Sequence, residues 1–199
     1  MAASECLLIL DFQNDLVHPE GAFRHWGIAY RVAEGRVLER TAALIAAARR
    51  AGVPVIYATY VVRPELADIP AKSKFFRLIA ESGALREGSW GGEIHEALIP
   101  RPGDLVIRKW RPNPFLGTDL ELVIRSGGAE LLVLAGIVTE WVVEEAARYA
   151  AALGYEVTVA ADCCESARDH LRDHALRRIL PQLGRVIPAV DLIRRWAGD

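Results

Sequence analysis

The sequence predicts an α/β fold, a Rossmann-like three-layer sandwich in which a six-stranded, mostly parallel sheet carries helices on both faces. Short apolar runs alternate with longer stretches of helical periodicity, and glycine or proline residues separate one segment from the next. Strands buried on both faces have such continuous apolar character. Alternating strands and helices in turn favour a parallel sheet between two helical layers.

Six apolar runs are predicted as strands. The first ends directly before Asp11, and the third is followed closely by Lys109. The fourth runs into a helical segment through Gly136, which is typical of a strand-to-helix turn. In chain order, the predicted strands are residues 6–10, 53–59, 104–107, 130–135, 156–161 and 185–187.

The segments between the strands have helical periodicity or frequent breaks. Residues 31–51 place alanine, leucine and isoleucine on one face and arginine on the other, and Gly52 ends this helix. Further helices are predicted at 118–126, 139–153 and 166–183. The stretch 63–102 is interrupted by glycine and proline, so we expect two short helices there, at 74–81 and 93–98, with loops over a pocket.

Length and composition favour one domain over residues 1–199, because 52% of 199 residues are hydrophobic. A net charge of −2 gives no reason to expect nucleic-acid or membrane binding. No apolar run reaches the ~20 residues that cross a bilayer, and the first residues do not resemble a signal peptide. Three cysteines cannot form an even disulfide set, which favours a reducing, cytoplasmic location.

Several polar groups at strand ends are expected to share one pocket, because ligands of open parallel sheets bind beyond the carboxyl ends of the strands. These groups are Asp11, Thr59, Lys109 and the segment 136–142. The first turn of the helix after the fourth strand could hold an activated nucleophile, since backbone N–H groups there attract negative charge. The residue best placed is Val142, which has no reactive atom. Taken singly, Asp11 and Lys109 are better explained as a loop-bonding carboxylate and a solvated lysine; their combination, with the turn at Gly136, favours a site.

Together these residues resemble the isochorismatase-like hydrolases, also called the cysteine hydrolase superfamily. The similar stretches are LLILDFQND at 7–15, EGSWGGEI at 87–94, KWRPNPFLGTDL at 109–120, and 136–148, which begins GIVT. The resemblance implies a triad in which an aspartate takes the proton of a cysteine thiol and a lysine lowers the thiol pKa. Asp11 and Lys109 match the aspartate and the lysine, whereas the position of the cysteine holds Val142.

The resemblance also implies a cis peptide at Ile137–Val138 and an oxyanion hole of backbone N–H groups. We expect the groups that hold the oxyanion or the substrate to be Val138, Glu140, Trp141, Gln13 and Trp90. Glu140 either faces solvent at the start of a helix or supplies a second carboxylate to the site.

Other residues are not expected to act as nucleophiles or metal ligands. Cys163 and Cys164 are expected to follow the fifth strand without a catalytic role, and Cys6 to pack at the wrong end of the first. No metal or other cofactor is expected, because residues 59–64 lack the histidine of the family's metal-dependent nicotinamidase branch. The alternating acids and histidines of residues 169–174 are more typical of a solvated helix face than of a metal site.

Three functions remain open from the sequence. The first is a hydrolase acting on a small carboxylate or cyclic metabolite through Asp11 and Lys109, without a covalent intermediate, as in the isochorismatases that cleave a vinyl ether. The second is a degenerate protein that binds a small molecule or a partner, and the third is a C–N hydrolase using Glu140 or a water activated by Asp11. Val142 would raise the pKa of Asp11 and Lys109 would lower it, and the sequence leaves the outcome open. By analogy, we expect a homodimer or homotetramer and a small-molecule substrate.

Overall fold

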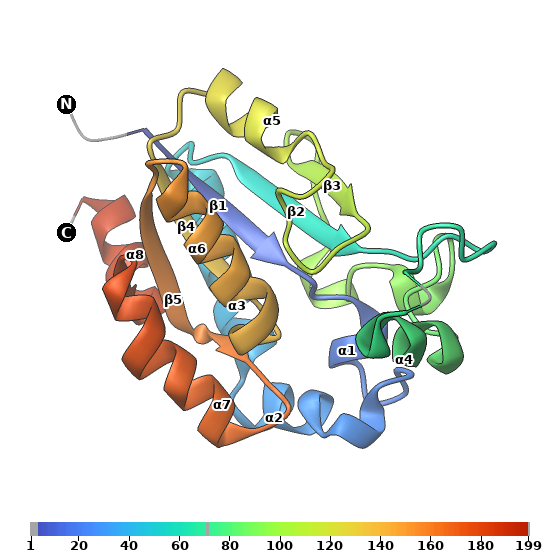
Figure 1. The fold of residues 1–199 in the computed structure, drawn as a ribbon. Coiled ribbons are helices and arrows are strands. Elements are labelled where there is room, and N and C mark those ends of the chain that lie inside the picture. Colours follow the sequence, from blue (N-terminus) through green and yellow to red (C-terminus); the bar gives the residue numbers. More distant parts are fainter. Residues whose placement is uncertain (1–3, 71, 199) are drawn as a thin grey trace.

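The computed structural model describes residues 4–70 and 72–198, so the predicted absence of a signal peptide falls partly on residues 1–3, outside the described part. Six strands form one sheet in the order β3-β2-β1-β4-β5-β6, and all five pairings are parallel, which confirms the predicted fold class (Figure 1). The strands are β1 (Glu5–Leu10), β2 (Val55–Tyr60), β3 (Leu105–Lys109), β4 (Leu131–Ile137), β5 (Glu156–Glu165) and β6 (Arg185–Ile187).

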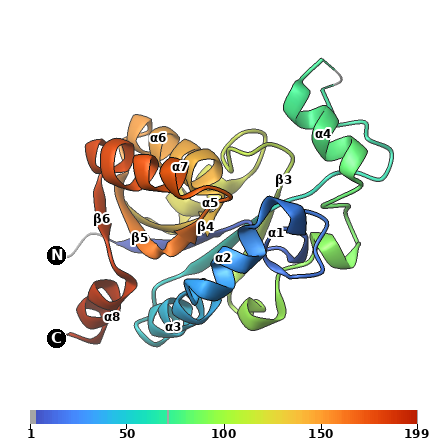
Figure 2. The same cartoon turned by 90° about the horizontal axis from the view of Figure 1, so that it is seen from below.

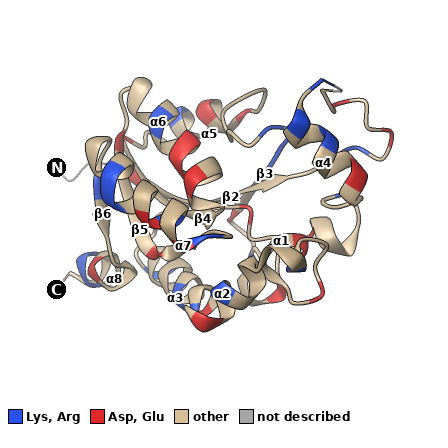
Figure 3. Ribbon diagram, turned by 60° about the horizontal axis from the view of Figure 1, so that its bottom comes forward, with Lys and Arg blue, Asp and Glu red and all other residues tan. Residues whose placement is uncertain are grey.

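Helices cover both faces of the sheet, as Figure 2 shows from below. One layer holds α2 (Ile28–Glu34), α3 (Val37–Arg50) and α8 (Ala189–Ala197), and the other holds α5 (Leu120–Ser126), α6 (Glu144–Ala152) and α7 (Asp169–His174). The short helices α1 (Asn14–Val17) and α4 (Lys74–Ser82) lie beyond the carboxyl ends of the strands. Acidic and basic residues are interspersed over the outer helices (Figure 3), consistent with the small net charge.

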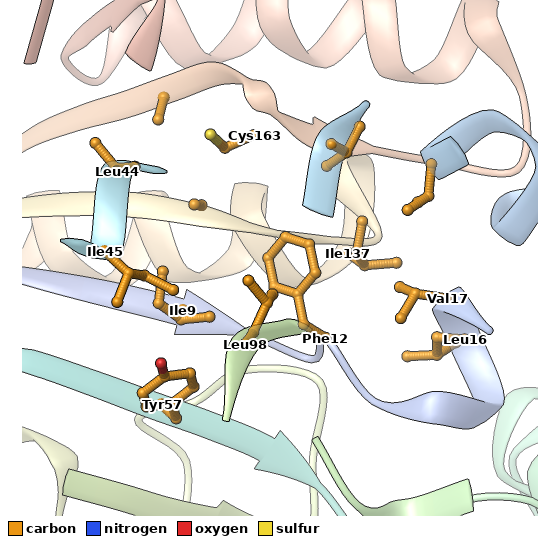
Figure 4. Close-up of a cluster of buried hydrophobic side chains, with 14 of the residues drawn as sticks. Ile9, Phe12, Leu16, Val17, Leu44, Ile45, Tyr57, Leu98, Ile137 and Cys163 are labelled. Atoms are coloured by element: carbon orange, nitrogen blue, oxygen red, sulfur yellow. The ribbon is translucent and has the colours of Figure 1, made fainter. Parts of the chain in front are cut away.

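Two hydrophobic clusters, one on each face of the sheet, form the core. Side chains alternate across a strand, so Leu7 and Ile9 of β1 belong to one cluster and Leu8 and Leu10 to the other. In Figure 4 the ring of Phe12 lies among the side chains of the first cluster, just past the end of β1. The chain therefore leaves β1 anchored by a buried aromatic residue directly after Asp11.

The close pairing of β1 with β4 requires a glycine at the strand-to-helix turn. Leu10 lies opposite Gly136 in this pair. A Cβ atom at Gly136 would lie 2.6 Å from the Cβ of Leu10, nearer than side-chain carbons approach one another. Glycine at this position lets the carboxyl ends of the two central strands lie side by side.

Several element boundaries differ from the predictions. The predicted helix 31–51 is two helices, because the backbone turns at Arg36, whose φ is 51°. The predicted helix 93–98 is reduced to a 3-10 turn (Glu96–Leu98), and α8 has no counterpart among the predicted elements. Strand β5 continues to Glu165, four residues beyond its predicted end, and α7 starts correspondingly late.

Strand β5 is longer than predicted because its register shifts opposite residues 134–136 of β4. Asp162 falls in this irregular part, and its carboxylate accepts a hydrogen bond of 2.7 Å from the backbone N–H of Ala189. A polar residue can therefore stand within the strand, and Cys163 and Cys164 lie inside β5 rather than after it. Separately, no helix in the described ranges is long and apolar enough to cross a membrane.

Candidate active site

The candidate site lies where the order of the strands reverses. From β1 the chain proceeds outward to β2 and β3, then returns to β4 on the other side of β1 and continues to β5 and β6. Ligands of open parallel sheets bind at such a reversal. Asp11 follows β1 there, the segment from Val138 onward follows β4, and Tyr60 and Lys109 end β2 and β3.

Asp11 and Lys109 form a buried ion pair. The Nζ of Lys109 donates to Oδ2 of Asp11 at 2.7 Å, although the two residues are 98 positions apart. Their side chains are 3% and 0% exposed. The second carboxylate oxygen of Asp11 accepts a hydrogen bond of 3.0 Å from the backbone N–H of Tyr60. The sequence-predicted convergence of these two residues is therefore present in the structure.

Lys109 is enclosed by acceptors. Besides Asp11, its ammonium donates to the carbonyl oxygens of Pro112 at 2.9 Å and Arg111 at 3.4 Å. Three N–H donors thus meet three acceptors, as a buried ammonium requires. Lys109 is the last residue of β3 rather than a loop residue after it, and the following turn bends back to supply both carbonyls.

Burial determines the electrostatics of this pair. Removal from water raises the pKa of Asp11, and Lys109 opposes that rise with a smaller effect. Burial likewise lowers the pKa of Lys109 against the opposing effect of Asp11. The question that the sequence left open is answered by the environment: desolvation prevails, and the Asp11 carboxyl holds a proton more readily than an exposed aspartate.

A cavity of about 260 Å³ opens beside Asp11. Val138, Glu140, Trp141 and Val142 line it from the segment after β4, so these four predicted residues meet Asp11 at one place. Val142 is buried and presents only its isopropyl group to the cavity. This side chain has no donor or acceptor, so it can form no hydrogen bond with Asp11, with water or with a ligand.

In the turn after β4, two backbone N–H groups form hydrogen bonds within the turn itself. The Ile137–Val138 peptide is cis, as the resemblance implied. In the π-helical turn that follows (Thr139–Val143), the N–H groups of Trp141 and Val142 donate to the carbonyl of Val138 at 3.2 and 2.9 Å. These two amides are therefore already bonded within the turn and do not form an open oxyanion hole in this structure.

Glu140 is held by a residue that the sequence did not suggest. The hydroxyl of Ser166 donates to Oε2 of Glu140, and the same Oγ accepts a 3.0 Å hydrogen bond from the N–H of Thr139. Ser166 is buried just past β5. Glu140 therefore lines the cavity rather than facing solvent alone. Ser166 carried no sequence signal, because β5 was expected to end well before it.

Gln13 and Trp90 lie apart from the cavity. The Gln13 side chain is fully buried; its Nε2 donates to the carbonyls of Tyr60 and Gly92, both at 2.8 Å, and its Oε1 accepts from the N–H of Tyr60 at 2.9 Å. Both of its N–H donors are thus engaged by backbone carbonyls, so the side chain joins two loops. Trp90 is 52% exposed and lines a separate hollow, with its ring 4.9 Å from that of His18. These two side chains therefore do not line the cavity beside Asp11, and their contact with a substrate stays a prediction.

The outer wall of the cavity comes from two segments, and one of them, α4, belongs to the stretch 63–102 that was predicted to lie over a pocket. Phe23 and Trp26 approach from the loop after α1, and Phe75 and Leu78 from α4. Their residue types are those of ordinary packing positions, so nothing in the pattern separates a pocket wall from a core. Trp110 does not line this cavity, and the guanidinium carbon of Arg63 lies 4.6 Å from the centroid of its ring.

The three cysteines lie elsewhere. All are buried, and none lines the cavity. Burial raises the pKa of the Cys6 and Cys163 thiols to about 12 and raises that of Cys164 as well, so each is held as an unreactive thiol. Among the described residues, no group of three or more potential ligands is arranged to hold a metal ion. Asp169 is instead paired with Arg31 and Arg172.

The chain is similar in sequence and in fold to known proteins. The 158-residue alignment with the ureidoacrylate amidohydrolase RutB of Methylobacterium radiotolerans is 32% identical and covers 73% of this chain, but only 61% of that protein's length. The isochorismatase family protein YecD of Escherichia coli O157:H7 is 31% identical over 201 residues, covering 96% of both chains. A cysteine hydrolase from Pseudomonas syringae pv. phaseolicola superposes with a TM-score of 0.86 at 25% identity, over 98% of this chain and 93% of that one.

A protein-family model also matches the sequence of this chain. The model for the isochorismatase domain matches residues 5–191, which span every strand of the sheet and both members of the buried ion pair. With the full-length relative and the superposed structure, this match shows that the chain belongs to the isochorismatase family of hydrolases.

Proposed function

We propose that the chain hydrolyses a small molecule by acid–base chemistry of Asp11 and Lys109, with water rather than a thiol as the attacking group. One observation carries the proposal: the Asp11 carboxyl, paired with Lys109 at 2.7 Å, faces a cavity in which no cysteine stands beside it. Asp11 is thereby the group placed to exchange a proton with a bound substrate or water.

Val142 occupies, in this proposal, the position of the family's nucleophilic cysteine. Its place in the first turn after β4, lining the same cavity as Asp11, supports the assignment. The three thiols of the chain are buried in strands β1 and β5 and are held protonated, so none can replace the missing group.

The proposed reaction on an amide-like substrate proceeds in two steps. The Asp11 carboxylate takes one proton from a water molecule, and the water oxygen bonds to the carbonyl carbon, whose π electrons move to its oxygen. As the C=O bond re-forms, the C–N bond breaks, and Asp11 gives its proton to the departing nitrogen. Lys109 stabilises the carboxylate before the first transfer. The burial that raises the Asp11 pKa brings it nearer to that of a neutral-pH base.

We favour C–N hydrolysis over vinyl-ether cleavage, because the relatives include a ureidoacrylate amidohydrolase. In the alternative vinyl-ether reaction, Asp11 in its acid form protonates the methylene carbon, and water adds to the resulting oxocarbenium ion. Both reactions use the same pair of residues and need no covalent intermediate, and they differ in their products.

A binding protein without turnover is the second candidate. The observation that favours it is the aliphatic side chain of Val142 beside the ion pair, since an intact pocket without an attacking group can still hold a ligand. The two candidates make opposite predictions for product release but the same prediction for ligand binding.

A substrate panel separates these functions. The purified protein is incubated with ureidoacrylate, isochorismate and a series of neutral amides while ammonia and pyruvate are measured, and each active substrate is repeated with Asp11→Asn and Glu140→Gln. We expect ammonia release that Asp11→Asn abolishes while circular dichroism shows an intact fold. Pyruvate release would indicate vinyl-ether chemistry. Ligand-induced thermal stabilisation without any product would contradict the enzymatic proposal and support the binding protein.

A further inference from the structure

We propose that the ligand of this cavity is a flat, largely apolar molecule that carries N–H donors and no negative charge. The proposal rests on the function proposed above and names the chemical class of its substrate. Three features support it: the aromatic walls of the cavity, the two acidic side chains that line it, and the lack of a lining cation among the described residues.

Two stacked aromatic pairs give the cavity flat walls. Phe23 and Trp26 stack with their ring centroids 4.2 Å apart, and Phe75 and Trp141 stack at 4.7 Å with an angle of 20° between the planes. All four side chains line the cavity. Two preformed pairs of this kind can extend their stacking to a planar group of a ligand.

The charged groups on the cavity wall are acids. Asp11 and Glu140 line it, and no lysine, arginine or histidine of the described residues does. The ammonium of Lys109 is fully buried behind Asp11, with its three donors engaged by Asp11, Arg111 and Pro112. A ligand carboxylate in this cavity would meet two carboxyl groups and no free cation, and a buried charge without a partner is strongly disfavoured.

Glu140 supplies a second polar contact in the cavity, in addition to Asp11. Its Oε2 accepts a hydrogen bond from Ser166, which fixes the carboxylate at the cavity. No hydrogen bond from another side chain in the described ranges reaches Oε1, so this oxygen can accept one from a ligand N–H. An amide, a carbamoyl group or an amidine offers such a donor, whereas a carboxylate offers none.

The lining of this cavity distinguishes the chain from the relative whose substrate is named. Ureidoacrylate is a carboxylate, so a protein that acts on it must accommodate a negative charge. The cavity described here has no lining cation for that charge, although it belongs to the same family. We therefore expect family-level similarity without a shared substrate.

Three probes of one shape test the proposal: benzamide, benzoate and benzamidine have the same ring and trigonal head group and differ in charge and in N–H donors. Their binding is measured by titration calorimetry at pH 7.5, separately from any turnover. We expect benzamide or benzamidine to bind at least tenfold more tightly than benzoate. The affinities of benzamide and benzamidine, compared with each other, show whether the cavity prefers a neutral or a cationic donor.

Two variants make the test specific to the cavity. Leu78 of α4 lines the cavity and is 45% exposed, so Leu78→Arg places a cation at its rim without burying it. This substitution should strengthen benzoate binding at least tenfold. The matched substitution Leu122→Arg, at an exposed leucine of α5 that does not line the cavity, should leave all three affinities unchanged. Glu140→Gln should reduce the ratio of the benzamide affinity to the benzoate affinity.

The outcomes distinguish this proposal from the function on which it rests. Benzoate binding as tightly as benzamide, or no binding of any probe at millimolar concentration, would overturn the ligand class. Preferential binding of the N–H donors with no hydrolysis of any substrate would support the ligand class and contradict the enzymatic function. Hydrolysis of anionic substrates, with benzoate as the tightest probe, would support the function and overturn the ligand class.

Discussion

Asp11 and Lys109 illustrate how two residues depend on each other when both are removed from water. Each charge is tolerated because the other is 2.7 Å away and because backbone groups complete the hydrogen bonds of both. The sequence allowed this pairing to be predicted, since both residues stand at the carboxyl ends of parallel strands and such ends share one edge of the sheet.

Removing one partner of this pair should cost far more than removing both. Asp11→Asn leaves a buried ammonium without its counter-charge, and Lys109→Met leaves a buried carboxylate, so we expect each to lower the free energy of unfolding by about 3–5 kcal/mol. The double substitution should lower it by less than the sum of the two. Urea unfolding of the four proteins measures this coupling. Additive losses would show that the two groups do not interact in solution.

Val142→Cys tests the identity of the nucleophile position. A thiol there would stand at the start of a helical segment, next to the buried ion pair, where Lys109 and the helix N-terminus lower its pKa. We expect one rapidly labelled thiol per chain with a thiol reagent and slow amidase activity. The native protein provides the control, because its three buried thiols should label slowly. Labelling no faster than in the native protein would argue against placing the nucleophile at Val142.

At the scale of elements, the 3-10 turn Glu96–Leu98 depends on a neutral histidine. Nδ1 of His95 accepts a hydrogen bond of 3.2 Å from the N–H of Ala97, which it can do only while that nitrogen is unprotonated. Burial lowers the pKa of His95, His18 nearby lowers it further, and Glu96 partly opposes them. Folding therefore favours the neutral ring.

The sign of the resulting pH dependence follows from that lowered pKa. The contribution of His95 to stability is fully present above the pKa of an unfolded histidine, about 6.5. It is lost as the pH falls below that value through the lowered pKa of the folded state. We expect His95→Asn, whose side chain also accepts a hydrogen bond, to reduce the fall in Tm between pH 7.5 and pH 5. His170→Asn on the exposed face of α7 serves as the control. An unchanged fall in His95→Asn would contradict the assignment.

The predictability of the elements varied with the strength of their patterns. The buried strands were located to within a few residues, because continuous apolar runs between turns have few other interpretations. Helix 31–51 was predicted as one element because Arg36 carries no mark of its left-handed backbone, a conformation in which glycine is far commoner. Strand β5 was predicted too short because only its bulge allows Asp162 within it.

The candidate site was predictable only in part, for a similar reason. Strand-end residues could be placed by topology, but Gln13 and Trp90 belong to loops whose course depends on tertiary contacts. Gln13 binds backbone groups of residues 60 and 92, and this role leaves no trace in a single sequence. The aromatic walls from α4 and the loop after α1 were likewise indistinguishable from packing residues.

At the scale of the whole molecule, the sheet brings distant segments to one cavity. The ends of β1, β2, β3 and β4 supply Asp11, Tyr60, Lys109 and Val142, and α4 and the loop after α1 cover them. The family membership explains this arrangement. The absence of a cavity-lining thiol among the described residues is what makes the proposed chemistry of this chain distinct.

The central claim, hydrolysis by Asp11 without a thiol, is tested most directly by measuring turnover in a protein without cysteines. The triple variant Cys6→Ala, Cys163→Ala, Cys164→Ala is compared with Asp11→Asn on the best substrate of the panel, after circular dichroism has verified both folds. The account predicts that the triple variant keeps a kcat within a few-fold of the native protein, whereas Asp11→Asn loses at least a hundredfold. Loss of activity in a folded triple variant, or full activity in Asp11→Asn, would contradict it.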